Sequence, residues 1–471
     1  MNPLLNPFVS FPLLKSYLFD PPRLRRSSIG DIKRYKDKAF RRIVKYAYSV
    51  PLYHEKYKQH GISPNDIKGI KDIEKLPFIS KEDLRNSFPD KLLPFGYNRK
   101  NSYTVCTGGT TGKPVCIFTD FFTIGKSSMI IIRELKELLH NVRGVRFAHL
   151  GNFTPRRIDL VVEKHFQPYI RFFNSSITLN IDISTPLGEI IKKLDDFKPD
   201  VIMSYPAIFQ HLAYLKRKGY GGNIKPKLCW TGGAMLDDYT REYVEDAFRC
   251  RLLNIYPSVE AGADIAFECL DGSWHVHDDF FHLEVINNKK EVLPLGEKGH
   301  IVLTRLWGRG TPIIRYIGMD DWINLSTNES CGCNLNSTIL INGVEGRRRA
   351  NIILPDGRVF PPGAFCFITP VLIKLKTFKV KQYQVIQKKM DEIEILLVID
   401  ENLRDIGPSV ETIKNEIKKV YELKVGSGVT INVREVSEIK HPKDSLKPPP
   451  IILSYVSERE GYETIESKLK R

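Results

Sequence analysis

Residues 107–114, Thr-Gly-Gly-Thr-Thr-Gly-Lys-Pro, combine the residue types that hold phosphate groups. Glycines let several backbone N–H groups turn toward one anion, and the threonine hydroxyls and the lysine ammonium add further donors. Strand-like runs over residues 102–106 and 115–118 flank the stretch, which favours a phosphate-binding loop over a plain glycine-rich hairpin. The candidate phosphate ligands are Thr107, Gly108, Gly109, Thr110, Thr111, Gly112 and Lys113.

This loop differs from the two common nucleotide-binding patterns. The P-loop requires a glycine five residues before its Gly-Lys glycine and a hydroxyl residue directly after the lysine, whereas Thr107 and Pro114 stand at those places. The dinucleotide fingerprint needs Gly-x-Gly spacing and the start of a helix, and both are missing here. The loop therefore belongs to another class of phosphate site.

Two carboxylates follow predicted strands. Glu260 ends the block Asn-Ile-Tyr-Pro-Ser-Val-Glu, which begins with Asn254 in a predicted buried strand over residues 252–255. Because parallel sheets bind ligands at the C-terminal ends of their strands, Glu260 is a candidate ligand for a Mg²⁺ ion that bridges ATP phosphates, and Tyr256 is a candidate contact for the base. Asp320, after a strand and a turn, is a candidate acceptor for both ribose hydroxyls. A surface glutamate at a strand end is the alternative interpretation of Glu260.

The hydrophobic pattern indicates which elements position these residues. From about residue 100, apolar strand candidates alternate with helical stretches, which is typical of a mostly parallel sheet covered by helices. We expect strands at 147–150, 169–172, 201–203, 228–230 and 252–255, and helices at 187–197, 207–218 and 237–248. After Tyr256 the pattern becomes β-rich, with strands at 281–286 and 300–304.

Past Gly346 the composition shifts to many lysines in a strand–strand–helix–strand order. The expected elements are strands at 382–386, 392–398 and 429–436 and a helix at 410–422. The expected fold class is thus α/β, with a large N-terminal domain of mostly parallel, helix-covered sheets plus a β-rich subdomain over residues 1–346. A small, mobile α+β domain follows over residues 347–471, with a hinge near Arg347.

Composition excludes several classes of protein. The 471 residues are 42% hydrophobic and 27% charged, as in a soluble globular protein, and no apolar run is long enough to span a membrane. The net charge of +16 is spread along the chain without a nucleic-acid-binding motif, so we expect no nucleic acid partner. Without a secretory signal, the eight cysteines indicate reduced thiols in a cytoplasmic protein rather than a disulfide framework. The oligomeric state is not readable from the sequence.

The loop at 107–114 resembles the phosphate loop of the AMP-forming ligases, the adenylating acyl-CoA synthetase superfamily. Within that superfamily it is most similar to the phenylacetate–CoA ligase and capsule-biosynthesis (CapK-like) branch. The resemblance extends over nearly the whole chain, and the joint order and spacing of its blocks carry it. The blocks are Val50-Pro-Leu-Tyr53, the loop, Lys198-Pro-Asp-Val-Ile202, Thr231-Gly-Gly-Ala234, Asn254 to Glu260, Thr311 to Asp320 and Gly343 to Asn351.

The resemblance implies a role for each block. Gly232, Gly233 and Ala234 would line the adenine and acyl pocket, Asp320 would bind ribose, and Arg347 would support ribose or phosphate. Glu260 would hold Mg²⁺. The C-terminal domain would deliver a lysine to the carboxylate and the α-phosphate, with Lys447 as the first candidate and Lys443 as the second. This chain departs from the family pattern at Pro257, which replaces a glycine, at Val259, which replaces a hydroxyl residue, and at Leu446, which replaces the glycine before the lysine.

The implied activity is ATP-dependent activation of a small carboxylic acid to an acyl-adenylate, with release of pyrophosphate and transfer to a thiol, coenzyme A above all. Two alternatives stay open. The adenylate could pass to an amine or hydroxyl acceptor in polysaccharide or secondary-metabolite synthesis, or the chain could be a non-catalytic homologue that keeps the fold. The identity of the acid is not readable from the sequence.

A cysteine and histidine group is a candidate structural zinc site. Cys331-Gly-Cys333 is a metal-ligand spacing, and the segment from Cys269 to His275 adds a third thiolate and an imidazole, which would complete a tetrahedral set. His277 is an alternate ligand. The resemblance agrees, because some members of this branch carry such a site. Unconnected cysteines remain the alternative.

Overall fold

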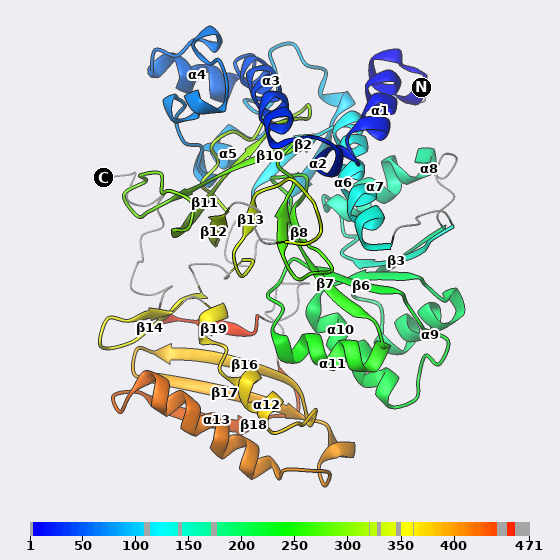
Figure 1. The fold of residues 1–471 in the computed structure, drawn as a ribbon, viewed down its shortest axis with the longest axis vertical. Helices are drawn as coiled ribbons and strands as arrows, with labels where there is room; N and C mark the ends of the chain where they lie inside the picture. The colour runs from blue at the N-terminus through cyan, green and yellow to red at the C-terminus, as the bar shows by residue number, and fades with distance from the viewer. Residues whose placement is uncertain are drawn as a thin grey trace.

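The computed structural model describes residues 3–107, 114–139, 144–170, 177–319, 321–326, 331–344, 350–360, 362–439 and 450–456. Within these residues an eleven-stranded sheet runs through the larger part of the protein, and a separate four-stranded sheet lies in the C-terminal part (Figure 1). The expected α/β class, with a large N-terminal part and a small C-terminal part, is confirmed.

One half of the large sheet is parallel, in the order β4-β3-β5-β6-β7. Its strands are β3 (Arg146–Gly151), β4 (Ile177–Asp182), β5 (Val201–Ser204), β6 (Leu228–Gly232) and β7 (Arg251–Ser258). The crossover helices are α9 (Leu187–Phe197), α10 (Pro206–Arg217) and α11 (Asp238–Phe248), close to their predicted positions. Buried aliphatic side chains fill the space between these strands and helices, as parallel sheets require on both faces.

The strand predicted at 169–172 is wrong at residues 169 and 170, which belong to the short helix α8 (Gln167–Ile170), and residues 171–172 lie outside the described residues. The edge strand of the parallel half is β4 (Ile177–Asp182). The apolar pair Tyr169 and Ile170 fits a helix as well as a strand, because a short apolar run carries no periodicity that separates the two.

The other half of the large sheet is antiparallel and continues in the order β7-β8-β9-β13-β12-β11-β10. This is the predicted β-rich part. Its strands are β8 (Ala263–Glu268), β9 (Trp274–Val276), β10 (Phe281–Ile286), β11 (Lys298–Arg305), β12 (Trp322–Ser326) and β13 (Ile339–Leu340).

The N-terminal segment supplies helices that pack around this sheet (Figure 1). They are α1 (Pro7–Phe19), α2 (Arg23–Arg26), α3 (Ile29–Ala47), α4 (Pro51–Gln59), α5 (Lys81–Ser87), α6 (Phe121–Leu139) and α7 (Ile158–His165). In α3 the buried residues recur at helical spacing, and Ser28 caps its N-terminus by accepting a hydrogen bond from the backbone N–H of Asp31. None of the helices among the described residues is long and apolar enough to cross a membrane.

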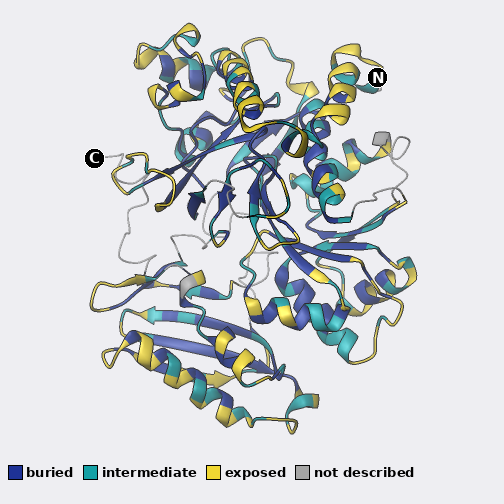
Figure 2. Cartoon of the chain, in the orientation of Figure 1, coloured by how far each residue is buried: buried dark blue, intermediate teal, exposed yellow. Residues whose placement is uncertain are grey.

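The C-terminal part has its own core of buried aliphatic and aromatic side chains (Figure 2). Its sheet has the order β18-β17-β16-β19, and the helix α13 packs on it. The elements are β14 (Ile352–Ile353), β15 (Val359–Phe360), α12 (Ile368–Lys374), β16 (Val380–Lys389), β17 (Glu392–Ile399), α13 (Val410–Val425), β18 (Thr430–Glu435) and β19 (Ile452–Ser454). Contact with the N-terminal part includes a hydrogen bond from the Tyr239 hydroxyl to the carbonyl of Val380.

The expectation that all cysteines are reduced is wrong for one pair. Cys106 and Cys116 form a disulfide between β1 (Tyr103–Cys106) and β2 (Cys116–Thr119). The two residues face each other in the antiparallel register of this hairpin, which brings the sulfur atoms together. The other six cysteines are free.

Candidate active site

A cavity of about 2610 Å³ lies between the C-terminal ends of the parallel strands and the C-terminal part of the protein. It is lined by residues from several predicted motifs, namely Thr107, Gly232, Gly233, Ala234, Tyr256 and Glu260. Residues from β16, β17 and the segment Pro450–Tyr455 line its other side. The motifs are distant in sequence, and the parallel strand order brings them to one wall.

Gly232 and Gly233 end β6 where space is limited. A Cβ atom on Gly232 would lie 2.7 Å from Cγ1 and 2.8 Å from the backbone oxygen of Ile255, on the neighbouring strand β7. Gly233 has a φ of +73°, and the ring of Tyr205 lies over it. Since L-residues with side chains disfavour this conformation, the glycines are required by the backbone, and Gly233 and Ala234 are exposed to the cavity.

Glu260 lies on the turn directly after β7 and is buried, with an exposed fraction of 8%. Its Oε2 accepts a hydrogen bond from the Ser258 hydroxyl at 3.0 Å, and its Oε1 accepts one from the Tyr316 hydroxyl at 3.0 Å. Among the described residues these are its hydrogen-bond partners, and both are neutral. The carboxylate is therefore oriented by hydroxyl groups while its negative charge stays available for a cation at the cavity, which fits a Mg²⁺ ligand.

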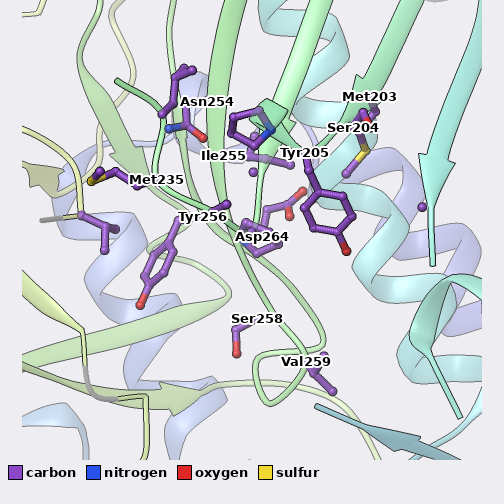
Figure 3. A pocket seen from close by; sticks show the side chains of 18 of the residues that line it. Met203, Ser204, Tyr205, Met235, Asn254, Ile255, Tyr256, Ser258, Val259 and Asp264 are labelled. Atoms are coloured by element: carbon purple, nitrogen blue, oxygen red, sulfur yellow. The ribbon is translucent and has the colours of Figure 1, made fainter. Parts of the chain in front are cut away.

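In an extended strand the Ser258 side chain lies on the face opposite Val259, the position at which the family pattern has a hydroxyl residue. The chain instead turns at residues 259–262, where the N–H of Gly262 donates to the carbonyls of Ser258 and Val259. The turn allows Ser258 to reach Glu260, and so it supplies the hydroxyl that Val259 lacks. Figure 3 shows Ser258, Val259 and Tyr256 among the side chains that line the pocket.

Tyr316 is positioned by the segment that carries the Thr311 to Asp320 motif. Its backbone N–H and carbonyl both bond to Leu303 of β11. The neighbouring Arg315 pairs with Glu284 at 2.8 Å and donates to the carbonyl of Leu76 at 2.7 Å. The Tyr53 hydroxyl donates to the carbonyl of Pro312 at 2.7 Å. The N-terminal Val-Pro-Leu-Tyr block thus supports the strand that holds Tyr316 against Glu260.

Tyr256 points toward the same region as the ribose motif. Its hydroxyl donates to Oδ2 of Asp321 at 2.5 Å, and both side chains line the cavity. Asp321 directly follows the predicted ribose ligand Asp320, which lies outside the described residues. Gly108 to Lys113, Arg347, Lys443 and Lys447 also lie outside them. Thr107, at the foot of the glycine-rich loop, is described, and its hydroxyl accepts a hydrogen bond from the backbone N–H of Val115 at 3.0 Å.

Cys269, His275, Cys331 and Cys333 come together in one cluster. Their candidate ligand atoms all lie within 4.8 Å of one another. The Cys333 sulfur is 3.1 Å from Nε2 of His275, whose Nδ1 is 2.9 Å from the Ser337 hydroxyl. Burial lowers the pKa of His275 to about 4, so its imidazole is neutral. With Nδ1–H donated to Ser337, Nε2 is free to bind a metal, and the donor set fits tetrahedral zinc.

The alternate ligand His277 does not belong to this cluster. Its Nε2 is bonded to Glu134 at 2.8 Å, and its Nδ1 faces Arg133 at 3.1 Å. His275 lies within β9, whereas His277 follows the end of the strand and bonds to Glu134 on α6.

Three residues at the site were not predicted from the sequence, namely Tyr316, Asp321 and Asp264. Tyr316 lies inside a predicted motif and Asp321 directly follows it, so the motif could have pointed to both residues. Their partners Glu260 and Tyr256 are 56 and 65 residues away, so the sequence did not indicate these contacts. Asp264 lines the cavity from β8 and is not part of any motif.

Comparison with known proteins gives sequence matches of moderate identity. The phenylacetate-coenzyme A ligase of Thermus thermophilus is 25% identical over 413 residues, which cover 83% of this chain and 86% of that ligase. The phenylacetate-coenzyme A ligase of Pseudomonas putida is 27% identical over 321 residues, or 64% of this chain and 67% of that ligase. No protein-family model matches the chain.

Solved structures share the fold. A 2-hydroxyisobutyryl-CoA ligase in the postadenylation state, in complex with R3-HIB-AMP, matches with a TM-score of 0.76 at 17% identity, over 96% of this chain and 94% of that one. The same enzyme in the thioesterification state, with 2-HIB-AMP and CoA, matches with a TM-score of 0.61. The sequence identity is 17% in both comparisons. The chain is thus similar in sequence to phenylacetate-coenzyme A ligases over most of its length, and it shares its fold with an adenylate-forming CoA ligase.

Proposed function

We propose that this protein activates a carboxylic acid with ATP to an acyl-adenylate, releases pyrophosphate and transfers the acyl group to coenzyme A. The observation that carries the proposal is the single cavity wall shared by Thr107, Gly232 to Ala234, Tyr256 and Glu260. The relatives support it, since they are phenylacetate-coenzyme A ligases, and the fold is shared with a ligase solved with 2-HIB-AMP and CoA.

Each step of this reaction has a candidate residue. Glu260 would hold the Mg²⁺ ion, which would neutralise phosphate charge during attack by the acid. The loop from Thr107 to Lys113 would hold the phosphates, Asp320 the ribose hydroxyls, and Arg347 the ribose or phosphate. A carboxylate that attacks a phosphate meets like-charge repulsion, and the Lys447 ammonium would offset it as charge develops.

We further propose that residues 1–346 and 347–471 act as two domains joined by a hinge near Arg347. The C-terminal domain would turn after adenylation, remove Lys447 from the site and admit the thiol, so that one cavity serves two half-reactions. The match to a postadenylation-state ligase is consistent with an arrangement before that turn.

The test is Mg²⁺- and ATP-dependent pyrophosphate release over a panel of aryl and aliphatic acids, with hydroxylamine to trap the adenylate. Acid-dependent release is the expected result. Lys447→Ala should abolish release and leave ATP binding mostly intact, whereas Lys443→Ala, at the second candidate, should release pyrophosphate normally. The reverse result would assign the role to Lys443. Adding coenzyme A, or amine and hydroxyl acceptors of the kind expected in the capsule-biosynthesis branch, identifies the acceptor. Absence of release with every acid would contradict the proposal.

We propose that Cys269, His275, Cys331 and Cys333 bind a structural zinc ion. It would join the end of β8, the strand β9 and the loop before β13. The measurement is the zinc content of the purified protein, with about one ion per chain expected. Cys333→Ser should lose the ion, and the matched control Cys366→Ser, which changes a half-buried thiol next to Tyr383, should keep it. Zinc-free wild-type protein purified with zinc in the buffers would refute the site.

We also propose a cytoplasmic location, because ATP and coenzyme A are available there. The six free cysteines agree with a reducing compartment, and the Cys106–Cys116 disulfide is the exception.

A further inference from the structure

Two buried carboxylates meet at the wall of the cavity. Asp264 lies on β8 and lines the cavity with an exposure of 6%, and Glu134 lies behind it on α6, fully buried. The helix packs against the strand, and the two carboxyl groups are close enough for each to shift the pKa of the other. Figure 3 shows Asp264 between Tyr256 and Tyr205 in that view of the pocket.

A β-bulge aims Asp264 at the cavity. Along the pairing of β7 with β8, Tyr256 faces Ala266 but Pro257 faces Asp264, so Ile265 is the extra residue. Proline has no N–H to continue the ladder, and a bulge re-aims the side chains that follow it. Pro257 is also the position at which this chain departs from the glycine of the family pattern. The replacement of glycine by Pro257 thus accounts both for the departure from the family pattern and for the orientation of Asp264 toward the cavity.

Glu134 is held in place from behind by a hydrogen-bonded chain. Arg133 can only donate, so its contact of 3.1 Å with Nδ1 of His277 makes that nitrogen an acceptor. The His277 proton is then on Nε2, which donates to Oε1 of Glu134 at 2.8 Å. Arg133 also pairs with Asp279 at 2.6 Å, so its charge is neutralised there. The other oxygen of Glu134, Oε2, receives no donor from the described residues.

The carboxyl pair keeps unused acceptor capacity on its cavity side. Two carboxyl groups in contact cannot both ionise, and burial raises the pKa of Asp264 to about 7 and the pKa of Glu134 well above its usual range. Burial thus favours the protonated form of each carboxyl group. Within the described part of the chain, the carboxyl group of Glu134 is the only polar side chain that interacts with Asp264.

We infer that the acid activated by this protein carries a hydrogen-bond donor, a hydroxyl or amine on its acyl part, which Asp264 accepts. The inference rests on the proposed function and names the substrate class of the same cavity. A buried carboxylate without a donor is costly, and a ligand that supplies one removes that cost. A site built around such a hydrogen bond rejects the analogue that lacks the donor far more strongly than an apolar pocket rejects a change in size.

The experiment compares matched acids in the pyrophosphate-release assay. The pairs are phenylacetate with para-hydroxyphenylacetate, benzoate with meta-aminobenzoate, and butyrate with gamma-hydroxybutyrate. In at least one pair the wild type should prefer the donor-bearing acid by about 10- to 100-fold in kcat/KM, mainly through KM. Comparing the hydroxyl pairs with the amine pair identifies which donor is recognised.

Asp264→Leu should remove or reverse this preference. The matched control is Glu394→Gln, because Glu394 also lines the cavity but is already bonded to Arg434 at 2.7 Å; the preference should be unchanged. If Asp264→Leu does not fold, the wild-type comparison still decides. Release that is equal or greater for the unsubstituted acid in every pair would overturn the inference and leave the proposed function standing. No release with any acid would overturn both.

Discussion

Gly232→Ala tests the close approach of β6 and β7 on which the cavity wall depends. The added Cβ would lie 2.7 Å from Cγ1 of Ile255, 2.8 Å from its backbone oxygen and 3.0 Å from Cδ of Pro257. A side-chain carbon can rotate away, but the backbone oxygen belongs to a ladder between parallel strands. The two strand ends must therefore separate to admit one methyl group.

The magnitude follows from two opposing effects. Overpacking a closely packed position costs about 1–3 kcal/mol, and the loss of glycine flexibility in the unfolded chain returns about 0.4–1 kcal/mol. We expect Gly232→Ala to lower the free energy of unfolding by about 1–2 kcal/mol. It should also weaken MgATP binding, because Tyr256 is the next residue of β7 after Ile255 and Glu260 follows the end of that strand.

The assay is denaturant unfolding followed by tryptophan fluorescence, with MgATP affinity measured by calorimetry on the same samples. Gly188→Ala is the matched control: no heavy atom lies within 4 Å of its Cβ position, and it belongs to α9, so alanine should leave stability equal or slightly higher. An unchanged unfolding midpoint and unchanged ATP affinity in Gly232→Ala would refute the geometry of this wall.

Three further predictions concern hydrogen bonding, pH and redox state. Tyr256→Phe removes the hydroxyl that donates to Asp321 and should weaken MgATP binding by about 10-fold in calorimetry. An unchanged Kd would show that the Tyr256–Asp321 hydrogen bond does not contribute to nucleotide binding. The pKa of Asp264 is raised by burial from 3.8 to about 7, so its contribution to stability is full below about pH 4 and is lost as pH rises through 7. Unfolding midpoints at pH 5 and pH 8 should therefore differ less in Asp264→Asn than in the wild type, and an equal difference would contradict the assignment. Unfolded, unreduced protein should take up a thiol reagent at the six free cysteines only, and at all eight after reduction of Cys106–Cys116; eight labels without reductant in mass spectrometry would exclude the disulfide.

The local pattern of apolar and polar residues in the sequence was sufficient to predict much of the fold. The helix at 187–197 and the strand at 281–286 occur with their predicted bounds, because helical and alternating periodicities depend only on near neighbours. The position of Glu260 at the end of a parallel strand followed from the apolar run before it. The ligand spacing in Cys331-Gly-Cys333 was local too, and the antiparallel pairing of β9 with β13 brings His275 to it.

What the sequence determined by itself was therefore the type and order of most elements and the resemblance to adenylate-forming ligases. Tertiary structure alone decided which distant side chains meet. Glu134 reaches Asp264 because α6 packs on β8, and Cys106 reaches Cys116 because of the register of one hairpin. The bulge beside Pro257 turns Asp264 toward the cavity. The physical reason is that packing and register depend on the shapes of segments far apart in the chain, so neither periodicity nor motif spacing records them.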